Sequence, residues 1–411
     1  MPNIYHGAAV TGSGSSFRST MTYTNGVYHL NERSIKKMDE DFKKKSYTNA
    51  AANLNNFSWV DANAIAIDTE GEGIINDYDF GAAIGERMGS LHEISDQRNI
   101  YQLQHVYSAR ETYERIYSDD RINERNLARV MKKLQEKLQV KVDKNRLLTW
   151  ANGAANTYVP TSSGSPVALS TSNIVRTLLT ANAMLDNMDV PESGRLAFIS
   201  ITDSIEMQLA DELKYQQEFT NKGAVNGAIR KLGRTTVVAV PDNRMPAGCK
   251  VLLKWKGASA DPNKMNYTKI FPEKEGHDAP LLNAIWRFDS FVLAHKANGI
   301  LVIGDSTAAP QAAPTAAAST SSGANKITFT SSNATGIIYT IDGHNPKIDG
   351  NGTSINLTAT SGTAVSAPDH DCYIQAYAYK TGIVNSGIAK WFYNSTSNTL
   401  TALAYDENVP I

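Results

Sequence analysis

Hydrophobic and charged positions follow a helical period from Ala109 to Trp150, a segment without glycine or proline. The apolar side chains recur every three or four residues and so share one stripe of a helix, while Glu, Lys, Arg and Gln fill the other faces. The stripe comprises Tyr113, Ile116, Tyr117, Leu127, Met131, Leu134, Leu138, Val142 and Leu147. The pattern predicts a helix over about 109–151, several times the usual length. Ser118-Asp119-Asp120 could restart it with a new cap.

A long helix with a narrow apolar stripe suits either a coiled coil or a rod that lies across a sheet. A coiled coil needs hydrophobic positions in a seven-residue repeat, and this stripe leaves that register near Val140 and Val142. We therefore interpret the segment as a rod within a folded body.

Two segments before the helix lack the apolar positions needed for a core of their own. Residues 1–56 form an arm, with a Gly-, Ser- and Thr-rich start and a short charged helix. Residues 57–98 form a projection, with a strand through FSWVDANAIAIDTEG, a glycine-rich acidic stretch and an extended return. A two-stranded projection is unstable alone, so we expect it to lie on another surface.

After the helix, the pattern alternates between strands and helices up to residue 305. Helices are expected at NIVRTLLTANAMLDNM and DSIEMQLADELK, with caps at Thr171 or Ser172 and at Thr202 or Asp203. Buried strands are expected at RLAFISI, TTVVAVPD, CKVLLKWKG and within AIWRFDSFVLAHKANGILVIGD. This order predicts an α/β or α+β domain.

The last part of the chain differs in composition. Residues 306–324 are nearly all Ala, Ser, Thr and Pro, which predicts a linker. Short strands separated by Gly, Asn, Asp and Pro turns follow over residues 325–411 and predict a small antiparallel sandwich.

Composition narrows the function mainly by exclusion. Apolar residues make up 41% and charged residues 20%, and the formal net charge is -1, which argues against a dedicated nucleic-acid binder. We expect no secretory signal in the first twenty residues and no membrane span. Cys249 and Cys372 fall in different predicted domains, which favours two buried thiols over a disulfide.

Candidate chemistry is sparse. No nucleophile, base and orienting group can be assembled, so we expect no enzyme and no cofactor. The eight histidines do not stand in HExxH or at ligand spacing with cysteine, so no metal site is predicted from them. Four aspartates leave calcium open as an alternative to turn chemistry, which we favour because Asp-Gly is a common turn dipeptide. They are Asp342, Asp349, Asp369 and Asp371.

Three stretches occur in a distinctive order over residues 1–305. An arm and a glycine-rich projection precede the long helix, which ends in VDKNRLLTWANGA. VPESGRLAFISITDSIEMQLADE and GAVNGAIRKLGRTTVVAVPDNRMP follow, and AIWRFDSFVLAHKANGILVI comes last. In this order they resemble the N-arm, E-loop and spine helix, the axial-domain passage and the closing strands of tailed-bacteriophage major capsid proteins, which share the Hong-Kong-phage-type fold.

The resemblance implies an α+β fold with an N-arm (1–56), an E-loop (57–98) and a capsid core (99–305). The core would contain the spine helix (about 109–151) and an axial domain (about 155–280). Some members cross-link their subunits through an E-loop lysine, but residues 57–98 contain none. We therefore expect a non-covalent shell.

The implied function is that of a structural protein of the virion, assembled in the host bacterial cytoplasm. It would form hexamers and pentamers of an icosahedral head around double-stranded DNA, with separate scaffold, portal and decoration proteins and no membrane. DNA would meet the inner face non-specifically, for example at the basic helical face of Lys132, Lys133, Lys137, Lys141 and Arg146, although interleaved acids favour a solvated or intersubunit face. The expected intersubunit contacts are Trp59, Ile65, Ile67, Tyr78, Phe80 and Arg87.

The end of the chain has a second resemblance. IIYTIDGHNPK, a Gly-Asn loop and YIQAYAYKTGIVNSGIA are similar to the small immunoglobulin-like module at the C-terminal end of some chitobiases and β-hexosaminidases. This implies that residues 325–411 form an immunoglobulin-like domain that faces outward from the shell.

Host-surface glycans are an expected partner of this domain, because aromatic rings stack on sugars. The candidates are Tyr373, Tyr377 and Trp391, although alternating aromatic residues are more often part of a core. The alternative function is therefore a carbohydrate-binding or surface-adhesion protein that uses the C-terminal sandwich.

Overall fold

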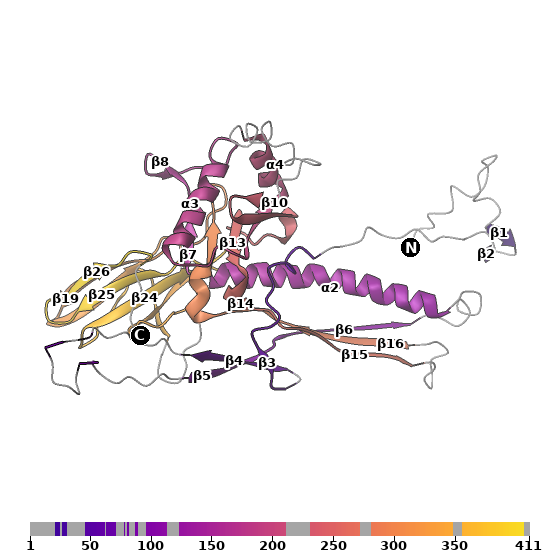
Figure 1. Cartoon of the computed structure of the whole chain (residues 1–411), viewed down its shortest axis with the longest axis horizontal. Coiled ribbons are helices and arrows are strands. Elements are labelled where there is room, and N and C mark those ends of the chain that lie inside the picture. Colours follow the sequence, from indigo (N-terminus) through magenta and orange to yellow (C-terminus); the bar gives the residue numbers. More distant parts are fainter. Residues whose placement is uncertain are drawn as a thin grey trace. The chain divides into compact units, whose positions relative to one another are not determined.

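The computed structural model describes residues 21–24, 27–30, 46–61, 63–70, 78, 80–81, 87–88, 96–112, 123–210, 231–271, 281–347 and 356–406 (Figure 1). The chain forms two compact units, each of which is described by itself. Unit 1 comprises Met1–Lys45, Ala109–Lys137 and Thr268–Ala284, and unit 2 comprises Ser46–Ser108, Leu138–Tyr267 and Ile285–Ile411.

The long helix is confirmed as α2, which runs over 31 residues from Asn123 to Gly153. The prediction that it begins near residue 109 is wrong, because β6 (His105–Thr112) is extended up to Thr112. Arg and Glu are good helix formers, but intrinsic propensity is worth little energy, and β-sheet pairing overrides it here. The alternative start at Ser118-Asp119-Asp120 lies outside the described residues.

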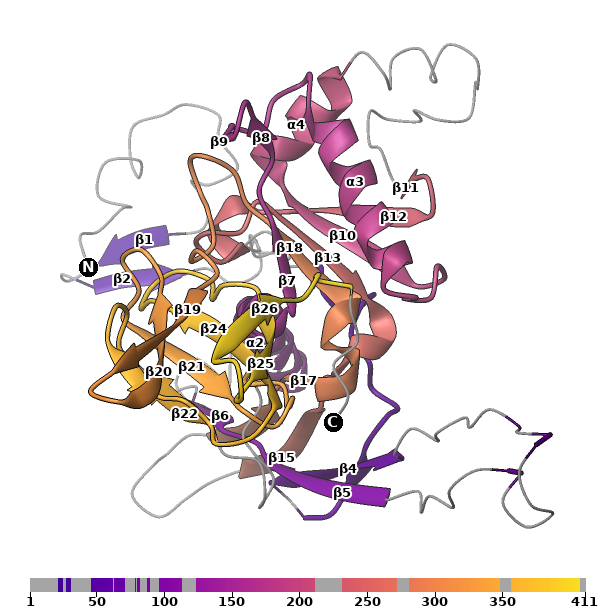
Figure 2. The same cartoon turned by 90° about the vertical axis from the view of Figure 1, so that its left-hand side faces the viewer.

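A six-stranded sheet forms the centre of unit 2 (Figure 2). Its strands, in spatial order, are β11 (Lys231–Leu232), β12 (Thr235–Val240), β10 (Arg195–Ser200), β13 (Val251–Trp255), β18 (Ile300–Ile303) and β7 (Asn156–Tyr158). β10 runs parallel to β12 and antiparallel to β13. Every residue of β10 and β18 is buried, which explains their continuous apolar sequences: both faces of the sheet are covered.

Alternate residues of these strands enter two separate clusters. Ile199 packs in one cluster with Leu178 and Met207, which lie on two helices. Phe198 packs on the opposite face with Trp150 of α2, and the two ring centroids are 5.7 Å apart. The helices of the first cluster are α3 (Ile174–Asn187) and α4 (Ile201–Leu209).

The caps of these helices differ from the predicted ones. Ser200 caps α4: its hydroxyl accepts from the Asp203 N–H at 3.0 Å and donates to the Asp203 carboxylate at 2.6 Å. α3 begins after Asn173, whose side chain does not cap the helix. The predicted caps at Thr171, Ser172, Thr202 and Asp203 are therefore wrong, because Ser200 ends β10 and leads directly into α4.

The chain also forms several smaller sheets. The base of the predicted projection is a sheet of β3 (Ser58–Trp59), β4 (Ala64–Glu70) and β5 (Asp96–Gln102). β15 (Asn263–Phe271) and β16 (Leu281–Phe288) form a separate sheet with β6. The remaining pairs are β14 (Ser259–Ala260) with β17 (Phe291–Val292), β8 (Thr161–Ser162) with β9 (Ser165–Pro166), and β1 (Met21–Thr24) with β2 (Val27–Leu30). Short 3-10 helices are η3 (Asp242–Arg244), η4 (Lys256–Ala258) and η5 (Ala294–Gly299).

Two sheets that share a core form the terminal sandwich, defined here as residues 315–402. One sheet contains β19 (Thr315–Ser321), β20 (Ala324–Thr330) and β23 (Ala364–Ser366). The other contains β22 (Leu357–Ala359), β21 (Gly336–Thr340), β24 (Cys372–Tyr379), β25 (Ala389–Asn394) and β26 (Thr399–Ala402). Phe329, Ile374 and Trp391 pack between them.

The predicted linker at residues 306–324 is wrong over its second half. Residues 315–321 form β19, which pairs with β20 through the turn at Ser322 and Gly323. Both turn residues have positive φ, 52° and 76°, as a two-residue type I′ hairpin requires. Residues 315–321, whose small side chains are typical of a linker, thus form a strand at the edge of the sheet.

Candidate subunit-contact and binding surfaces

A buried polar network joins residues 46–49 to the second half of α2. Asp143 is fully buried and accepts from the Ser46 and Thr48 hydroxyls, both at 2.7 Å, and from the Tyr47 N–H at 3.0 Å. Arg244 completes the site as an ion pair with Asp143 at 2.7 Å. A buried carboxylate is stable only when it is paired and hydrogen-bonded, and each of these partners contributes to that.

A second buried charge lies one turn further along the helix. Arg146 donates to the Asn49 side chain at 2.7 Å and to Thr48 at 3.3 Å. Burial lowers the pKa of the Arg146 guanidinium, and the carboxylates of Asp261 and Asp143 oppose that shift. Arg146 is therefore buried and not part of an exposed basic face, which corrects its predicted place on that face.

Lys254 extends the network. Its Nζ donates to the Ala51 carbonyl at 2.7 Å and lies 4.4 Å from the centre of the Trp150 ring. Desolvation lowers the pKa of Lys254 to about 8. Asp261 accepts from the Trp150 indole at 3.0 Å and from the Asn53 N–H at 2.9 Å.

These bonds fix the end of the predicted arm. Residues 46–53 are held on α2 and the central sheet, and Thr48 and Ala51 are fully buried. The predicted arm of residues 1–56 therefore includes a segment that belongs to the folded core. No local sequence signal shows this, since the partners are about a hundred residues apart.

The structure separates the six predicted intersubunit contacts into two groups. Ile65 and Ile67 are buried, with exposed fractions of 0% and 4%, in a cluster with Leu103, Ala260 and Leu293. Their side chains stabilise the chain's own core, so they are not available to a neighbouring subunit. The sequence missed this because it shows which residues share a strand face but not what covers that face.

The other predicted contacts are accessible. Tyr78 and Phe80 are 49% and 82% exposed, and their rings form an edge-to-face pair with centroids 4.9 Å apart. Trp59 is 37% exposed and lies under Lys264, whose Nζ is 4.8 Å from the ring centre. Arg87 is half-buried.

Further exposed apolar side chains in the same region were not predicted as contacts. They are Leu54, Val60, Met88, Ile100 and Val106, each at least half exposed or close to it. Apolar residues on a strand face that remains open to solvent are the signal that could have identified Ile100. A group of exposed apolar residues on one region suits contact with another protein surface.

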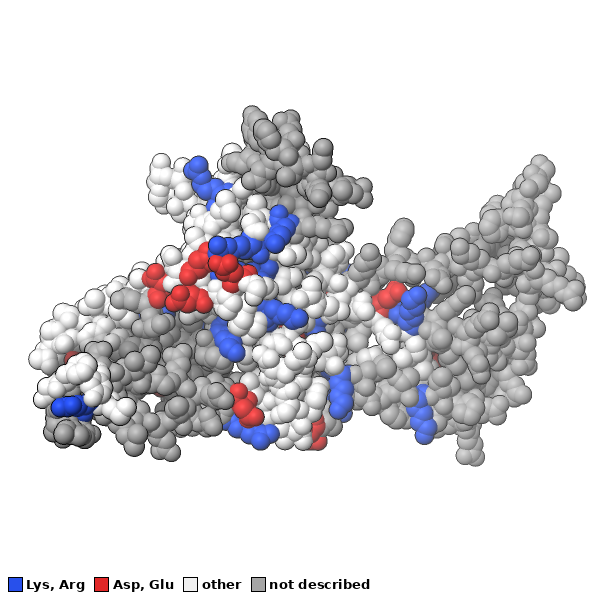
Figure 3. All heavy atoms as spheres, viewed as in Figure 1, with Lys and Arg blue, Asp and Glu red and all other residues white. Residues whose placement is uncertain are grey.

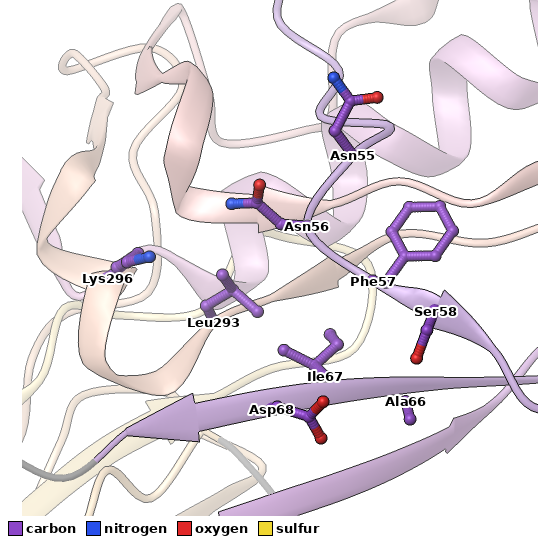
Figure 4. Close-up of a pocket in the computed structure, with 9 residues that line it drawn as sticks. All are labelled: Asn55, Asn56, Phe57, Ser58, Ala66, Ile67, Asp68, Leu293 and Lys296. Atoms are coloured by element: carbon purple, nitrogen blue, oxygen red, sulfur yellow. The ribbon is translucent and has the colours of Figure 1, made fainter.

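An open pocket of about 360 Å³ lies beside β4 (Figure 4). Ile67 and Leu293 lie near its centre, with Asn56 and Lys296 at one side. Its lining residues are Asn55, Asn56, Phe57, Ser58, Ala66, Ile67, Asp68, Leu293 and Lys296. One lysine and one carboxylate without histidine or cysteine do not form a nucleophile-and-base set.

The predicted glycan contacts are mostly interior. Trp391 is 6% exposed and packs with Phe329 in the core of the sandwich, and Tyr377 is 9% exposed. These two predictions are wrong for the folded chain, because a sugar needs an accessible ring face. Tyr373 is partly exposed and pairs across strands with Phe392, with ring centroids 5.2 Å apart.

The three-stranded sheet of the sandwich presents a face without aromatic rings. Its outward side chains alternate with core residues such as Ile327 and Phe329. They are Thr315, Ala317 and Ser319 on β19, Lys326 and Thr328 on β20, and Ala364 and Ser366 on β23. Small hydroxyl-bearing residues on a flat sheet offer hydrogen bonds rather than stacking.

Two of the aspartates considered for calcium accept hydrogen bonds from the protein itself. The Asp342 carboxylate accepts from the His344 N–H at 3.1 Å, and Asp371 accepts from the Ser395 N–H at 2.7 Å. Asp349 lies outside the described residues. Within the described ranges, no group of three or more His, Cys, Asp or Glu side chains is placed to hold a metal ion.

Both cysteines are buried and unbonded to each other, as predicted. Burial raises the pKa of the Cys249 thiol well above its usual range and that of Cys372 to about 11. Neither thiol is therefore a reactive thiolate at neutral pH.

Charge is interspersed on the surface. On the face shown in Figure 3, the described residues are largely uncharged, and Lys and Arg lie close to Asp and Glu. Lys132, Lys133 and Lys137 of α2 are exposed. Across the part of the chain that the structure describes, no helix is both long and apolar enough to cross a membrane.

Comparison with known proteins identifies the fold but not a sequence family. No protein-family profile matches the chain, and no curated protein sequence matches it. A chain from the capsid structure of the cyanophage P-SCSP1u has a TM-score of 0.52 and 12% identity, and the match covers 66% of this chain and 90% of that one. A chain of Mycobacterium phage Che8 has a TM-score of 0.48 and 14% identity, with 69% and 98% covered.

A chain from the asymmetric unit of the mature capsid of bacteriophage PhiM1 is also similar, with a TM-score of 0.49 and 9% identity over 65% of this chain and 89% of that one. At these identities the likeness concerns the fold alone, and the cyanophage structure carries it. Over 66% of its length, this chain has the α+β fold of a phage capsid chain.

Proposed function

We propose that this chain is the major capsid protein of a tailed double-stranded DNA bacteriophage and self-assembles into its icosahedral head shell. The observation that carries the proposal is the likeness to the cyanophage capsid chain, which covers 90% of that chain. A likeness over nearly a whole capsid subunit favours the role of a subunit over that of a protein that borrows one domain.

Shell formation needs a stiff subunit with surfaces that repeat. The buried ion pair of Asp143 with Arg244 and the hydrogen bond from Lys254 to Ala51 join distant segments of unit 2 around the end of α2. The exposed apolar residues of the projection provide contact surface for a neighbouring copy. Many weak contacts of this kind, repeated by symmetry, make a shell cooperative.

The intersubunit contacts that we retain are Trp59, Tyr78, Phe80 and Arg87, and we add Met88 and Ile100. Large, exposed apolar side chains are energetically unfavourable on a free monomer and become favourable when a neighbour covers them. The fold likeness favours a structural role over an enzymatic one.

The proposed role includes a location in the virion, where the chain forms hexamers and pentamers. Its proposed partners are a separate scaffold protein, portal and decoration proteins, and packaged DNA, which it contacts non-specifically.

We also propose that the terminal sandwich is an immunoglobulin-like domain that faces outward from the shell and binds host glycans. Tyr373 with its neighbour Phe392 is the remaining stacking site for a sugar. The carbohydrate-binding alternative has less support, because Tyr377 and Trp391 are buried.

Size-exclusion chromatography with light scattering, followed by electron microscopy of the fractions, tests the proposal. Shells, tubes or capsomer-sized rings are expected from the purified protein, alone or with a candidate scaffold. A strictly monomeric protein at high concentration and with scaffold would contradict it.

A further inference from the structure

The terminal sandwich is joined to the α/β body by more than a covalent connection. The loop between β24 and β25 carries Val384. Its side chain is 0% exposed and packs in the cluster of Leu147, Trp150 and Ala154. A side chain of the sandwich thus completes the core around the end of α2.

Backbone hydrogen bonds continue this contact along the loop. The Val384 N–H donates to the Ala247 carbonyl at 3.0 Å, and the Ile388 N–H donates to the Ala155 carbonyl at 2.7 Å. Between them, Gly387 lies so close to Thr157 that an added Cβ would be 3.0 Å from its hydroxyl. The loop is therefore bonded both to the segment after α2 and to the segment around Ala247.

Lys347 approaches the same helix end from another turn of the sandwich. Its Nζ donates to the Ala154 carbonyl, one residue beyond α2, at 2.5 Å. Burial lowers the pKa of the Lys347 amine to about 7, and the amine donates this hydrogen bond in either protonation state. Asn385 adds a bond from its N–H to the Asn152 side chain at 3.2 Å.

The connecting residues are also fastened. Asp305 accepts from the Leu169 N–H at 3.2 Å and from the Ala308 N–H at 2.7 Å. A Cβ on Gly304 would lie 2.5 Å from Pro310, so the strap folds tightly back on the end of β18. Residues 305–311 are thus a fixed strap, although their composition is that of a flexible linker.

We propose that the terminal sandwich is an intramolecular latch on the C-terminal end of α2, closed by Val384, Lys347 and the loop of residues 384–388. While the latch is closed, it caps the helix and completes the core beneath the six-stranded sheet. When it opens, the helix end and β7 lose their packing together. Figure 2 shows the sandwich strands in front of this end of α2. The latch is a property of the single chain and does not depend on shell formation.

Hydrogen exchange on the full-length chain tests the latch, with Val384→Asp as the opening variant. A carboxylate at this fully buried, apolar position is costly to desolvate and does not fit the packing of the cluster. Amides of residues 150–158 should therefore exchange about 100-fold faster or more, a factor that corresponds to about 2.8 kcal/mol. Amides of Ile374 and Ala376 should stay protected, because the sandwich has its own core. The matched control is Thr381→Asp in the exposed part of the same loop, which should leave exchange unchanged.

Unchanged protection of residues 150–158 in Val384→Asp would overturn the proposal. If that variant unfolds throughout, exchange of the wild-type chain at increasing urea decides instead. The latch requires the amides of Val384 and Ile388 to open with the same free energy as those at the end of α2. If the loop opens at a lower free energy of opening while the helix end stays protected, the loop contact does not stabilise the end of α2.

Discussion

At the scale of single residues, Asp143 is the most consequential side chain of the network. Substitution by Ala removes the counter-charge of Arg244 and the acceptor of Ser46 and Thr48. Loss of one partner from a buried ion pair costs about 3–5 kcal/mol, so urea unfolding of Asp143→Ala should show a loss of that size. Lys144→Ala is the control, because its side chain is exposed on the next position of α2. Equal stability of the two variants would refute this role.

Lys254 makes the stability of the chain depend on pH. Its pKa is lowered from 10.5 to about 8 by burial, so between these values the unfolded chain binds more protons than the folded one. Stability should therefore rise as the pH rises from about 8 to 10.5, and the contribution is constant below pH 8, where both states are protonated. Urea denaturation of Lys254→Met at several pH values in this range should give a plot of unfolding free energy against pH whose slope is smaller, by an amount equivalent to about one bound proton. An identical slope in the variant and the wild type would contradict the burial of a charged amine.

Residue-level sites could be predicted only in part. The exposed positions Tyr78 and Phe80 follow from apolar residues in a glycine-rich stretch that cannot form a core. The burial of Ile65 could not be predicted, because it depends on which distant segment covers that strand face. The network of Asp143 was missed for the same reason. For Trp391, the alternation of aromatic residues already favoured a core position over a sugar contact.

At the scale of elements, the projection should separate the stability of the subunit from its assembly. The double substitution Tyr78→Ala and Phe80→Ala removes an exposed ring pair, so the monomer should melt as the wild type does while the yield of shells or capsomers falls. Ile67→Ala should instead lower the stability of the monomer, because it leaves a buried cavity that costs about 2–5 kcal/mol of unfolding free energy. Light scattering and thermal melts distinguish the two effects. Normal assembly of the double variant would remove this pair from the contact surface.

Element types were predicted better than element ends. The α2 rod, the buried strands β10, β12, β13 and β18 and most strands of the sandwich follow from periodicity and turn residues. The early start of α2 and the linker at residues 306–324 were wrong, because β6 and β19 are stabilised by partner strands rather than by their own composition. A local pattern of apolar and polar residues does not show which distant strand a segment pairs with.

At the scale of the whole molecule, the order of segments predicted the capsid fold, whereas the integration of the last domain could not be predicted. Composition marked the strap as flexible, and only the structure shows Val384 in the core beside Trp150. The sandwich is therefore part of the folded subunit in unit 2.

Removal of residues 306–411 tests which description of the terminal sandwich holds. A purely decorative domain would leave the body folded and able to assemble. The contacts of Val384, Ile388 and Lys347 imply instead that truncation exposes apolar core and leaves the end of α2 without its cap. We expect a lower melting temperature, increased binding of a hydrophobic dye and loss of assembly. A truncated chain that melts and assembles like the full-length protein would show that the docked domain is decoration after all, because the body would then have completed its core without it.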